Sequence, residues 1–419
     1  MGNKLNVTIV GGGMITGDLL LPAVYHLQRI EVIGNINVCA LSSEHLKLLK
    51  EKKDLLAAFP GQDFISYPLI SETPAKSFPN LYKEVVAKNG SHQLVIVAVP
   101  DDLHYEVIMH ALNCDQHVLC VKPLVLKYSQ AEEITKVAYN KGLFVGVEYH
   151  KRFDRRNLIA RRNYKEGLFG EFMLGEAKMI EPYYYRKSNF QNWFTTQHTD
   201  AFVYVGCHYV DLVYFITGLK PIGVSVAGIR KKFPNGNDGY LWANGRIKFE
   251  NGAILSVLNG LGYPNNAAGA NAQSLIMYCE GKEGSGLIEH IDNVRGTSHC
   301  YIKDRDEQDP LFRYVNPDFN RLVSWEGTGL KPVGYGYDSI AATINVVNRM
   351  EKEVQFIQED NALERRQVII KEIDNKGVIA TPANSYVNEL VNEAARISIL
   401  NDGKFVKIIY GNKPHIEPT

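Results

Sequence analysis

Three consecutive glycines, Gly11–Gly13, follow an apolar run near the start of the chain. Gly11 can adopt the backbone angles of a tight turn, and Gly13 has no Cβ to keep a phosphate away from the main chain. The N-terminus of the helix that follows presents free N–H groups, which attract anions. The pattern predicts a strand, a turn and a helix that bind the pyrophosphate of a dinucleotide, with contacts from Gly11, Gly13, Met14 and Ile15.

One position departs from the glycine pattern of such turns. Thr16 stands where the third glycine of G-x-G-x-x-G is expected, so the packing of helix on strand must accommodate a hydroxyl and a methyl group. A glycine-rich turn that binds nothing is the alternative interpretation, and the surrounding elements must decide between the two.

Lys122 and Pro123 follow directly after the apolar segment His117–Val121. Because Pro123 fixes its own φ and restrains the preceding residue to extended geometry, the Lys122 ammonium is held in one direction. A solvated surface charge is the common fate of a lysine. A directed lysine at the end of a buried strand is instead a candidate for proton transfer.

A second set of candidate residues, Gly206–Asp211, opens an apolar segment that ends at Gly218. The spacing predicts a helix in which His208 and Asp211 share the N-terminal turn. His208 is then a candidate for the reaction centre, and the alternative is a histidine that caps the helix or lies in the core.

Alternating strands and helices must position these residues. Strand-like runs occupy residues 36–41, 94–99, 117–121 and 143–148, and helical patterns occupy 18–28, 105–113 and 129–141. Such alternation predicts right-handed crossovers and a parallel sheet. Ligands bind beyond the carboxyl ends of parallel strands, which here carry the glycine turn, Ser42, Pro100–His104 and Lys122.

The segment VAVPDDLHYEVIMHALNCDQHVLCVKPLVLKYSQAEEI, residues 97–134, resembles the hallmark stretch of the Gfo/Idh/MocA family of oxidoreductases. That family has a Thr-Pro-Asn-x-x-His loop after a strand, and a Glu-Lys-Pro after the next one. Here Asp101 replaces the Asn and Val121 replaces the Glu. The resemblance implies cofactor contacts by Pro100, Asp101, His104 and Lys122, and a role for Lys122 in substrate binding and proton transfer.

The segment Gly206–Asp211 is similar to the family's Gly-x-His-x-x-Asp signature, in which the His contacts the reacting hydroxyl. Many sugar and inositol dehydrogenases have an Asp four residues before that His, where this chain has Tyr204, and Asp200 is a fallback further upstream. The resemblance implies Lys122, His208 and Tyr204 as the catalytic group. Tyr204 can donate a hydrogen bond but cannot replace a carboxylate.

The resemblance implies an NAD(P)-dependent oxidoreductase that transfers a hydride between nicotinamide and a carbinol carbon of a sugar, polyol or sugar derivative. Lys122 would be the acid or base, and His208 would orient the hydroxyl. Two alternatives are a redox-neutral sugar reaction on a tightly held NAD and a non-catalytic regulator that binds NAD(P).

Substrate and cofactor specificity have weaker signals in the sequence. Candidate substrate-binding residues are Tyr149, Arg152, Asp211, Tyr185 and Trp193. Tyr185 and Trp193 suit stacking on a sugar ring or, equally, a subunit interface. Ser42, with lysines on the next helix and no acid at the strand end, favours NADP slightly over NAD, although serines that only cap that helix are an equal alternative.

After residue 150 the pattern changes to alternation typical of antiparallel strands, with a hairpin turn at Glu250–Gly252. We expect an α/β chain made of two domains. Residues 1–150 would form a Rossmann-type dinucleotide-binding domain, and residues 151–419 an α+β substrate-binding domain with a large, mainly antiparallel open sheet. We expect loops and short strands over residues 285–335. The apolar spacing predicts amphipathic helices over residues 339–354 and 383–400.

Composition narrows the function classes. The formal net charge is +0 and the charged fraction is 22%, which favours neither nucleic acid nor an anionic membrane as a partner. The 6 cysteines are scattered without a C-x-x-C pair, so we expect a reduced, cytoplasmic chain without a metal site. The family resemblance implies a homodimer or homotetramer that forms through the C-terminal sheet.

Overall fold

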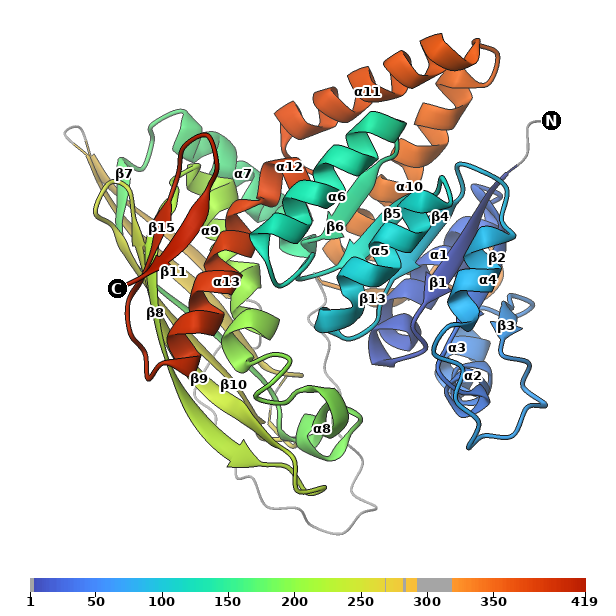
Figure 1. The fold of residues 1–419 in the computed structure, drawn as a ribbon, viewed down its shortest axis with the longest axis horizontal. Helices are drawn as coiled ribbons and strands as arrows, with labels where there is room; N and C mark the ends of the chain where they lie inside the picture. Colours follow the sequence, from blue (N-terminus) through green and yellow to red (C-terminus); the bar gives the residue numbers. More distant parts are fainter. Residues whose placement is uncertain (1–3, 268, 282–283, 292–318) are drawn as a thin grey trace. The chain divides into compact units, whose positions relative to one another are not determined.

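The computed structural model describes residues 4–267, 269–281, 284–291 and 319–419 (Figure 1). The chain divides into two compact units. The first unit comprises Met1–Val125, Ser129–Phe153 and Asn320–Asn384, and the second comprises Leu126–Tyr128, Asp154–Phe319 and Ser385–Thr419. This division departs from the boundary predicted at residue 150, because a late segment of the chain returns to the first unit.

The first unit is built on a six-stranded sheet with the order β3-β2-β1-β4-β5-β6. All of its strand pairs are parallel, which confirms the predicted Rossmann-type sheet. The strands are β1 (Leu5–Val10), β2 (Ile33–Cys39), β3 (Ile65–Tyr67), β4 (Leu94–Val97), β5 (His117–Val121) and β6 (Val145–Glu148).

Continuous apolar runs explain the central strands of this sheet. Every residue of β4 is buried, as expected for a strand that is covered on both faces. The helices between the strands are α1 (Leu21–Arg29), α2 (Ser43–Lys50), α3 (Lys53–Ala58), α4 (Leu81–Ala87), α5 (His104–Asn113) and α6 (Tyr128–Lys141). Short helical turns also occupy Thr16–Leu20, Asp101–Leu103 and His150–Phe153.

The returning segment adds a two-stranded sheet and two long helices to the first unit. It contains β13 (Arg321–Ser324), β14 (Leu330–Val333), α10 (Tyr335–Val354), α11 (Glu359–Lys376) and α12 (Pro382–Ser385). Ile340, Ile344 and Val347 form a fully buried stripe on α10, which confirms the amphipathic helix predicted there. Val147 of β6 pairs with Ala380, so the return is fastened to the edge of the main sheet.

The second unit holds an eight-stranded sheet with the order β12-β11-β7-β10-β9-β8-β15-β16. Only the pair β7 and β10 is parallel among these described strands, which confirms a mainly antiparallel open sheet. The strands are β7 (Glu171–Pro182), β8 (Pro221–Lys232), β9 (Asp238–Phe249), β10 (Ile254–Tyr263), β11 (Ala272–Gly281), β12 (Gly284–Ile291), β15 (Val406–Ile409) and β16 (His415–Pro418).

Helices of the second unit pack on one face of that sheet. They are α7 (Arg155–Lys165), α8 (Phe190–Trp193), α9 (Cys207–Thr217) and α13 (Val387–Leu400), with helical turns at Tyr183–Lys187 and Phe202–Gly206. Tyr209 and Val210 of α9 and Leu390 of α13 belong to the same hydrophobic core as the sheet residues Leu255 and Val257. Of the segment predicted as loops and short strands, residues 292–318 lie outside the described residues.

Among the helices of the described residues, none combines the length and the apolar character that crossing a membrane requires.

Candidate functional site

The glycine turn after β1 has the geometry that phosphate binding requires. Gly11 has φ +123°, and a Cβ built there would lie 2.0 Å from the carbonyl oxygen of Ala98. Apart from Gly13 and its two neighbours in the chain, no atom of the described residues lies within 4 Å of a Cβ built at Gly13. Gly11 therefore lets β1 pass close to the end of β4, whereas Gly13 leaves its main chain open to a ligand.

Thr16 closes this turn from inside the helix. Its hydroxyl donates a hydrogen bond of 2.7 Å to the carbonyl oxygen of Gly11, and the side chain is fully buried. The helix begins at Met14, and residues Thr16–Leu20 are wound as a π-helical turn before α1. The departure from the third glycine thus adds a bond that ties the helix to the turn, a contact that the sequence pattern does not reveal.

Ser42 lies at the start of α2, but its hydroxyl does not cap that helix. The oxygen lies 2.9 Å from Nδ1 of His45, and the neighbouring Ser43 donates to the carbonyl of Glu72 at 2.7 Å. Lys47 pairs with Glu51 at 3.9 Å and Lys50 with Asp63 at 2.7 Å. The lysines that favoured NADP therefore have carboxylate partners of their own.

His104 links two loops at the carboxyl edge of the sheet. Its ring is fully buried, with Nδ1 2.7 Å from the carbonyl oxygen of Pro123 and Nε2 2.9 Å from that of Val99. Both ring nitrogens lie within hydrogen-bonding distance of main-chain carbonyl oxygens, so His104 bridges the loops that carry Pro100, Asp101 and Lys122. Asp101 is buried in the short helical turn that starts at this loop.

Lys122 lies just beyond β5 and is half-buried. The residue before it, Val121, is in register with Glu148 of the parallel strand β6. Residues in register on adjacent parallel strands present their side chains to the same face of a sheet. A carboxylate therefore stands beside position 121 although residue 121 is a valine.

Glu148 is almost fully buried and is held by two partners from the first unit. Nδ1 of His150 lies 2.8 Å from one carboxylate oxygen, and the hydroxyl of Ser339 donates to the other at 2.7 Å. The ring of His150 stacks on Tyr335 with centroids 5.6 Å apart. The returning helix α10, which carries Ser339 and Tyr335, thus supports the end of β6.

Tyr149 and Arg152 follow Glu148 and are 2% and 1% exposed. The guanidinium of Arg152 donates to Oδ1 of Asn384 at 3.0 Å and to the carbonyl of Gly377 at 3.5 Å. These bonds fasten the returning segment to the end of the sheet. A role of Tyr149 or Arg152 in substrate binding stays a prediction.

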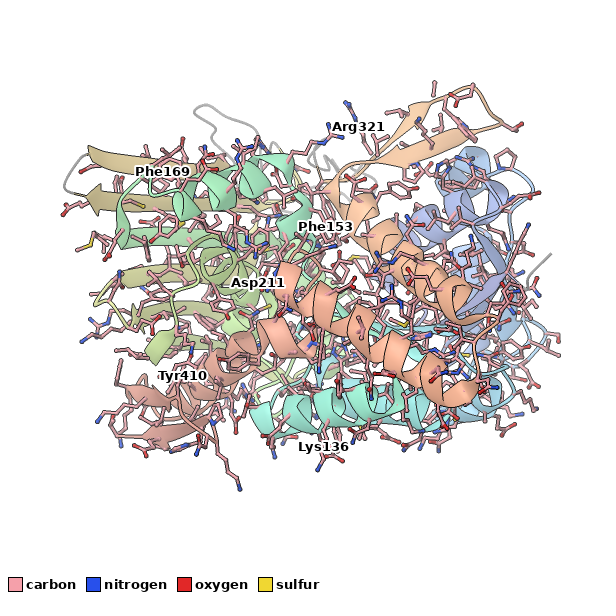
Figure 2. The ribbon with its side chains drawn as sticks, turned by 90° about the horizontal axis from the view of Figure 1, so that it is seen from above. Lys136, Phe153, Phe169, Asp211, Arg321 and Tyr410 are labelled. Carbon is pink, nitrogen blue, oxygen red and sulfur yellow. The ribbon has the colours of Figure 1, made fainter. Side chains whose placement is uncertain are left out.

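His208 does not lie in the first turn of its helix, contrary to the expectation from the sequence. The π-helical turn Phe202–Gly206 runs into α9 without a break, so His208 belongs to a later turn. Its side chain is almost fully buried, as is that of Asp211, which accepts a hydrogen bond of 2.8 Å from Nδ2 of Asn388. Figure 2 marks Asp211 on α9.

The carboxylate of Asp200 has a structural role at the start of the helix that carries His208. One oxygen accepts the backbone N–H groups of Phe202 and Val203, both at 3.0 Å, and so caps the helix. The other oxygen lies 3.1 Å from Nη1 of Arg396. Since both oxygens are engaged and the side chain is fully buried, the helix start is anchored to α13.

The structure brings Tyr185, Trp193 and Tyr204 into one aromatic cluster with Phe190 and Phe194. The ring of Tyr204 lies 5.3 Å from Phe190 and 5.6 Å from Trp193, both near edge-on. Tyr185 stacks on Phe190 at 4.6 Å. These residues therefore pack on one another. Their mutual packing explains the cluster without a bound sugar or a subunit interface.

One group of side chains has metal-ligand chemistry among the described residues, namely His92, His117 and Glu351. The N–H of Phe144 donates to Nδ1 of His117 at 3.0 Å, so the proton of that ring is on Nε2, which lies 3.0 Å from Glu351. Arg366 binds both oxygens of Glu351, at 2.9 and 2.8 Å. Burial alone would raise the pKa of Glu351, but the hydrogen bonds from His117 and Arg366 lower it to about 2. Hydrogen bonds from His117 and Arg366 thus engage both carboxylate oxygens of Glu351.

Two features were missed by reasoning from the sequence. Glu148 was not singled out, because only the register of β5 and β6 places it beside Val121. The buried polar residues Asn388 and Asn392 of α13 were also missed, although their four-residue spacing in an apolar helix was a visible signal.

Comparison with known proteins agrees with this geometry. Residues 5–149 match the profile of an oxidoreductase family with an NAD-binding Rossmann fold. The uncharacterized oxidoreductase YhhX of Escherichia coli is 31% identical over 259 residues, which make up 60% of this chain and 70% of YhhX. D-glucoside 3-dehydrogenase of Escherichia coli is 24% identical over 248 residues, 54% of this chain and 66% of that protein.

Solved structures extend the likeness over both units. An inositol dehydrogenase homolog from Azotobacter vinelandii, complexed with NADH and myo-inositol, aligns over 97% of this chain and 98% of its own, with a TM-score of 0.59 and 17% identity. At this identity the likeness is one of fold. For two curated relatives from Schizosaccharomyces pombe, the match spans only 34% of their own length.

Proposed function

The chain belongs to the Gfo/Idh/MocA family of oxidoreductases, and from this premise we propose that it is an NAD(P)-dependent dehydrogenase or reductase. Its reaction moves a hydride between nicotinamide and a CH–OH carbon of a sugar, polyol or sugar derivative. The names of D-glucoside 3-dehydrogenase and of the inositol dehydrogenase homolog support this substrate class.

The residues of the glycine turn fit a dinucleotide. Gly11, Gly13, Met14 and Ile15 would hold the pyrophosphate, because the main chain at Gly13 is open and the helix N-terminus attracts anions. When bound, the nicotinamide accepts or donates the hydride. Cofactor choice in such folds is made at the end of the second strand. Ser42 follows β2 and is bonded to His45 of α2. The absence of an acid at Ser42 supports acceptance of NADP as well as NAD.

Lys122 acts as the acid or base in this proposal. It takes the hydroxyl proton when an alcohol is oxidised and returns a proton when a carbonyl is reduced. Glu148 supplies a negative charge beside the end of β5, where the family has its Glu. His208 orients and polarises the same hydroxyl oxygen, and Asp211 and Tyr204 lie on the helix that positions it.

A single observation carries the proposal. The open glycine turn follows β1, and Lys122 follows β5, and the two parallel strands are separated in the sheet only by β4. Since parallel strands spaced about 4.8 Å apart end at a common edge, the pyrophosphate cradle and the lysine share one edge of one sheet. A dinucleotide bound at the turn extends along such an edge.

The test combines cofactor titration with one variant. Oxidised and reduced NAD and NADP are titrated into the protein, and a panel of inositols, aldoses and glycosides is then assayed for nucleotide reduction. Lys122→Ala should lower kcat about 10²- to 10⁴-fold while dinucleotide binding persists. The exposed Lys136→Ala on α6 serves as the matched control.

Two results would contradict the proposal. Full turnover in Lys122→Ala would remove the lysine from the chemistry. Dinucleotide binding without nucleotide reduction by any compound of the panel would instead favour a redox-neutral reaction or a regulator.

The outer face of the sheet supports the proposed self-association. Leu174 of β7, Tyr278 of β11 and Leu287 of β12 are in register with one another and are 53%, 53% and 54% exposed. Adjacent exposed apolar side chains of this kind are typical of protein interfaces. We therefore keep the homodimer or homotetramer formed through this sheet as part of the proposal.

A further inference from the structure

A polar face on α13 is buried in the second unit. Asn388, Asn392 and Arg396 follow at four-residue spacing and therefore lie on one side of the helix. Two of the three have partners on, or directly before, the helix that carries His208. Asn388 donates to Asp211 at 2.8 Å, and Arg396 donates to Asp200 at 3.1 Å.

These two contacts fix the relative direction of the helices. The early residue Asn388 meets the late residue Asp211, and the late residue Arg396 meets the early residue Asp200. The two helical segments therefore run in opposite directions. Asn392, midway along the polar face, is level with the turn between Tyr204 and His208.

One side of the continuous helix formed by the turn Phe202–Gly206 and α9 carries three of the predicted site residues. Tyr204, His208 and Asp211 recur at spacings of four and three, which places them on one face. Gly206 lies on the opposite face, where an added Cβ would come 2.7 Å from Oδ1 of Asn259 in the sheet. The face that meets Asn388 is therefore the one that also carries His208.

Asn392 has unused hydrogen-bonding capacity in this place. Its side chain is fully buried, and neither Oδ1 nor Nδ2 has a hydrogen-bond partner among the described residues. Oδ1 of Asn388 likewise has none in the described part of the chain. Buried amides are almost always hydrogen-bonded in folded proteins, so a ligand or an ordered water is expected here.

We propose that Asn388 and Asn392 form a hydroxyl-binding subsite beside His208, which takes adjacent hydroxyl groups of an uncharged polyol or sugar. Each hydroxyl both donates and accepts, which matches the donor and acceptor of the Asn392 amide and the free acceptor of Asn388. The carboxylate of Asp211, bonded to Asn388, disfavours a phosphorylated ligand. The inference rests on the proposed function in one respect, namely that the polyol or sugar bound here is the substrate of the reaction.

Direct binding measurements test the subsite apart from turnover. Binding of myo-inositol, scyllo-inositol and methyl β-D-glucoside is measured by calorimetry on the wild-type protein with saturating reduced nucleotide. Asn392→Ala should bind the tightest of them at least 10-fold more weakly and raise KM more than it lowers kcat. Asn401→Ala, near the exposed end of the same helix, should bind as the wild type does.

A second experiment uses only the wild-type protein, so its result does not depend on whether a variant folds. Wild-type crystals soaked with the tightest of these compounds should show a ligand hydroxyl within hydrogen-bonding distance of the Asn392 amide. Water alone at Asn392 in the soaked crystal, no binding of any of the three compounds, or unchanged affinity in a folded Asn392→Ala would each overturn the subsite. A polyol bound at Asn392 without nucleotide reduction would uphold the subsite and refute the proposed function.

Discussion

At the scale of single residues, the two outer glycines of the turn after β1 have different tasks. Gly11 has a backbone conformation that side chains rarely adopt, and a Cβ there would collide with the main chain of Ala98. Gly13 has open space around the position of its missing Cβ. One glycine is needed by the fold and the other by the ligand.

We predict that Gly11→Ala and Gly13→Ala differ in which property they lose. Gly11→Ala should lower the free energy of unfolding. Backbone strain accounts for about 1–3 kcal/mol of this loss, before the collision with Ala98 is counted. Gly13→Ala should keep the wild-type stability and weaken dinucleotide binding at least about 10-fold, since the new methyl group occupies the phosphate's space. Thermal unfolding and fluorescence titration measure the two effects. Unaltered dinucleotide affinity in Gly13→Ala would speak against a pyrophosphate at this turn.

Thr16 shows how a departure from a motif can be compensated. Replacing it by valine keeps the shape and removes the hydrogen bond to Gly11, so Thr16→Val should lose about 1 kcal/mol of stability. Thr16→Ser retains the hydroxyl and is the matched control, expected to lose less. Chemical denaturation of both variants provides the comparison. Equal stabilities would mean that the bond contributes nothing.

At the scale of elements, the returning helices are joined to the main sheet by the network around Glu351. His117 begins β5, Glu351 lies on α10 and Arg366 lies on α11. Arg366 and His117 are buried, so loss of the carboxylate would leave a guanidinium without its bidentate partner. The network therefore couples three elements that are distant in the chain.

This network makes a specific prediction for acid unfolding. The pKa of Glu351 is lowered from 4.5 to about 2, so its contribution is complete above pH 4.5 and is lost as the pH falls toward 2. Glu351→Gln should be less stable by about 1–3 kcal/mol at neutral pH, a difference that shrinks as the pH falls. Denaturation at several pH values measures this, with Glu353→Gln as a more exposed control. A stability difference that is constant with pH would contradict the assignment.

At the scale of the whole molecule, the open sheet of the second unit exposes a row of apolar side chains. We predict that Leu174→Asp combined with Tyr278→Asp lowers the oligomeric mass of the protein in solution, because two charges in an apolar interface are costly to bury. Leu56→Asp, on α3 of the first unit, is an equally exposed control that should leave the mass unchanged. Light scattering after gel filtration gives the masses. The same mass in the double variant and the wild type would place any interface elsewhere.

Much of the first unit followed from the sequence because its signals are local. The glycine turn, the continuous apolar strands and the helices between them each lie within a short stretch of chain, and alternation alone implies a parallel sheet. The alternation after residue 150 likewise implied the mainly antiparallel sheet, whose turns are local as well. Helix α11 and the pair β15 and β16 were not foreseen.

What the sequence by itself determined was therefore the type of each domain and the family to which the chain belongs. Only the tertiary structure decided that Glu148 stands beside Val121, that residues 320–384 return to the first unit, and that Asn388 meets Asp211. The physical reason is the same in all three cases. Strand register and helix packing bring together residues that are far apart in the chain, and no local pattern of side chains records which partner each will meet.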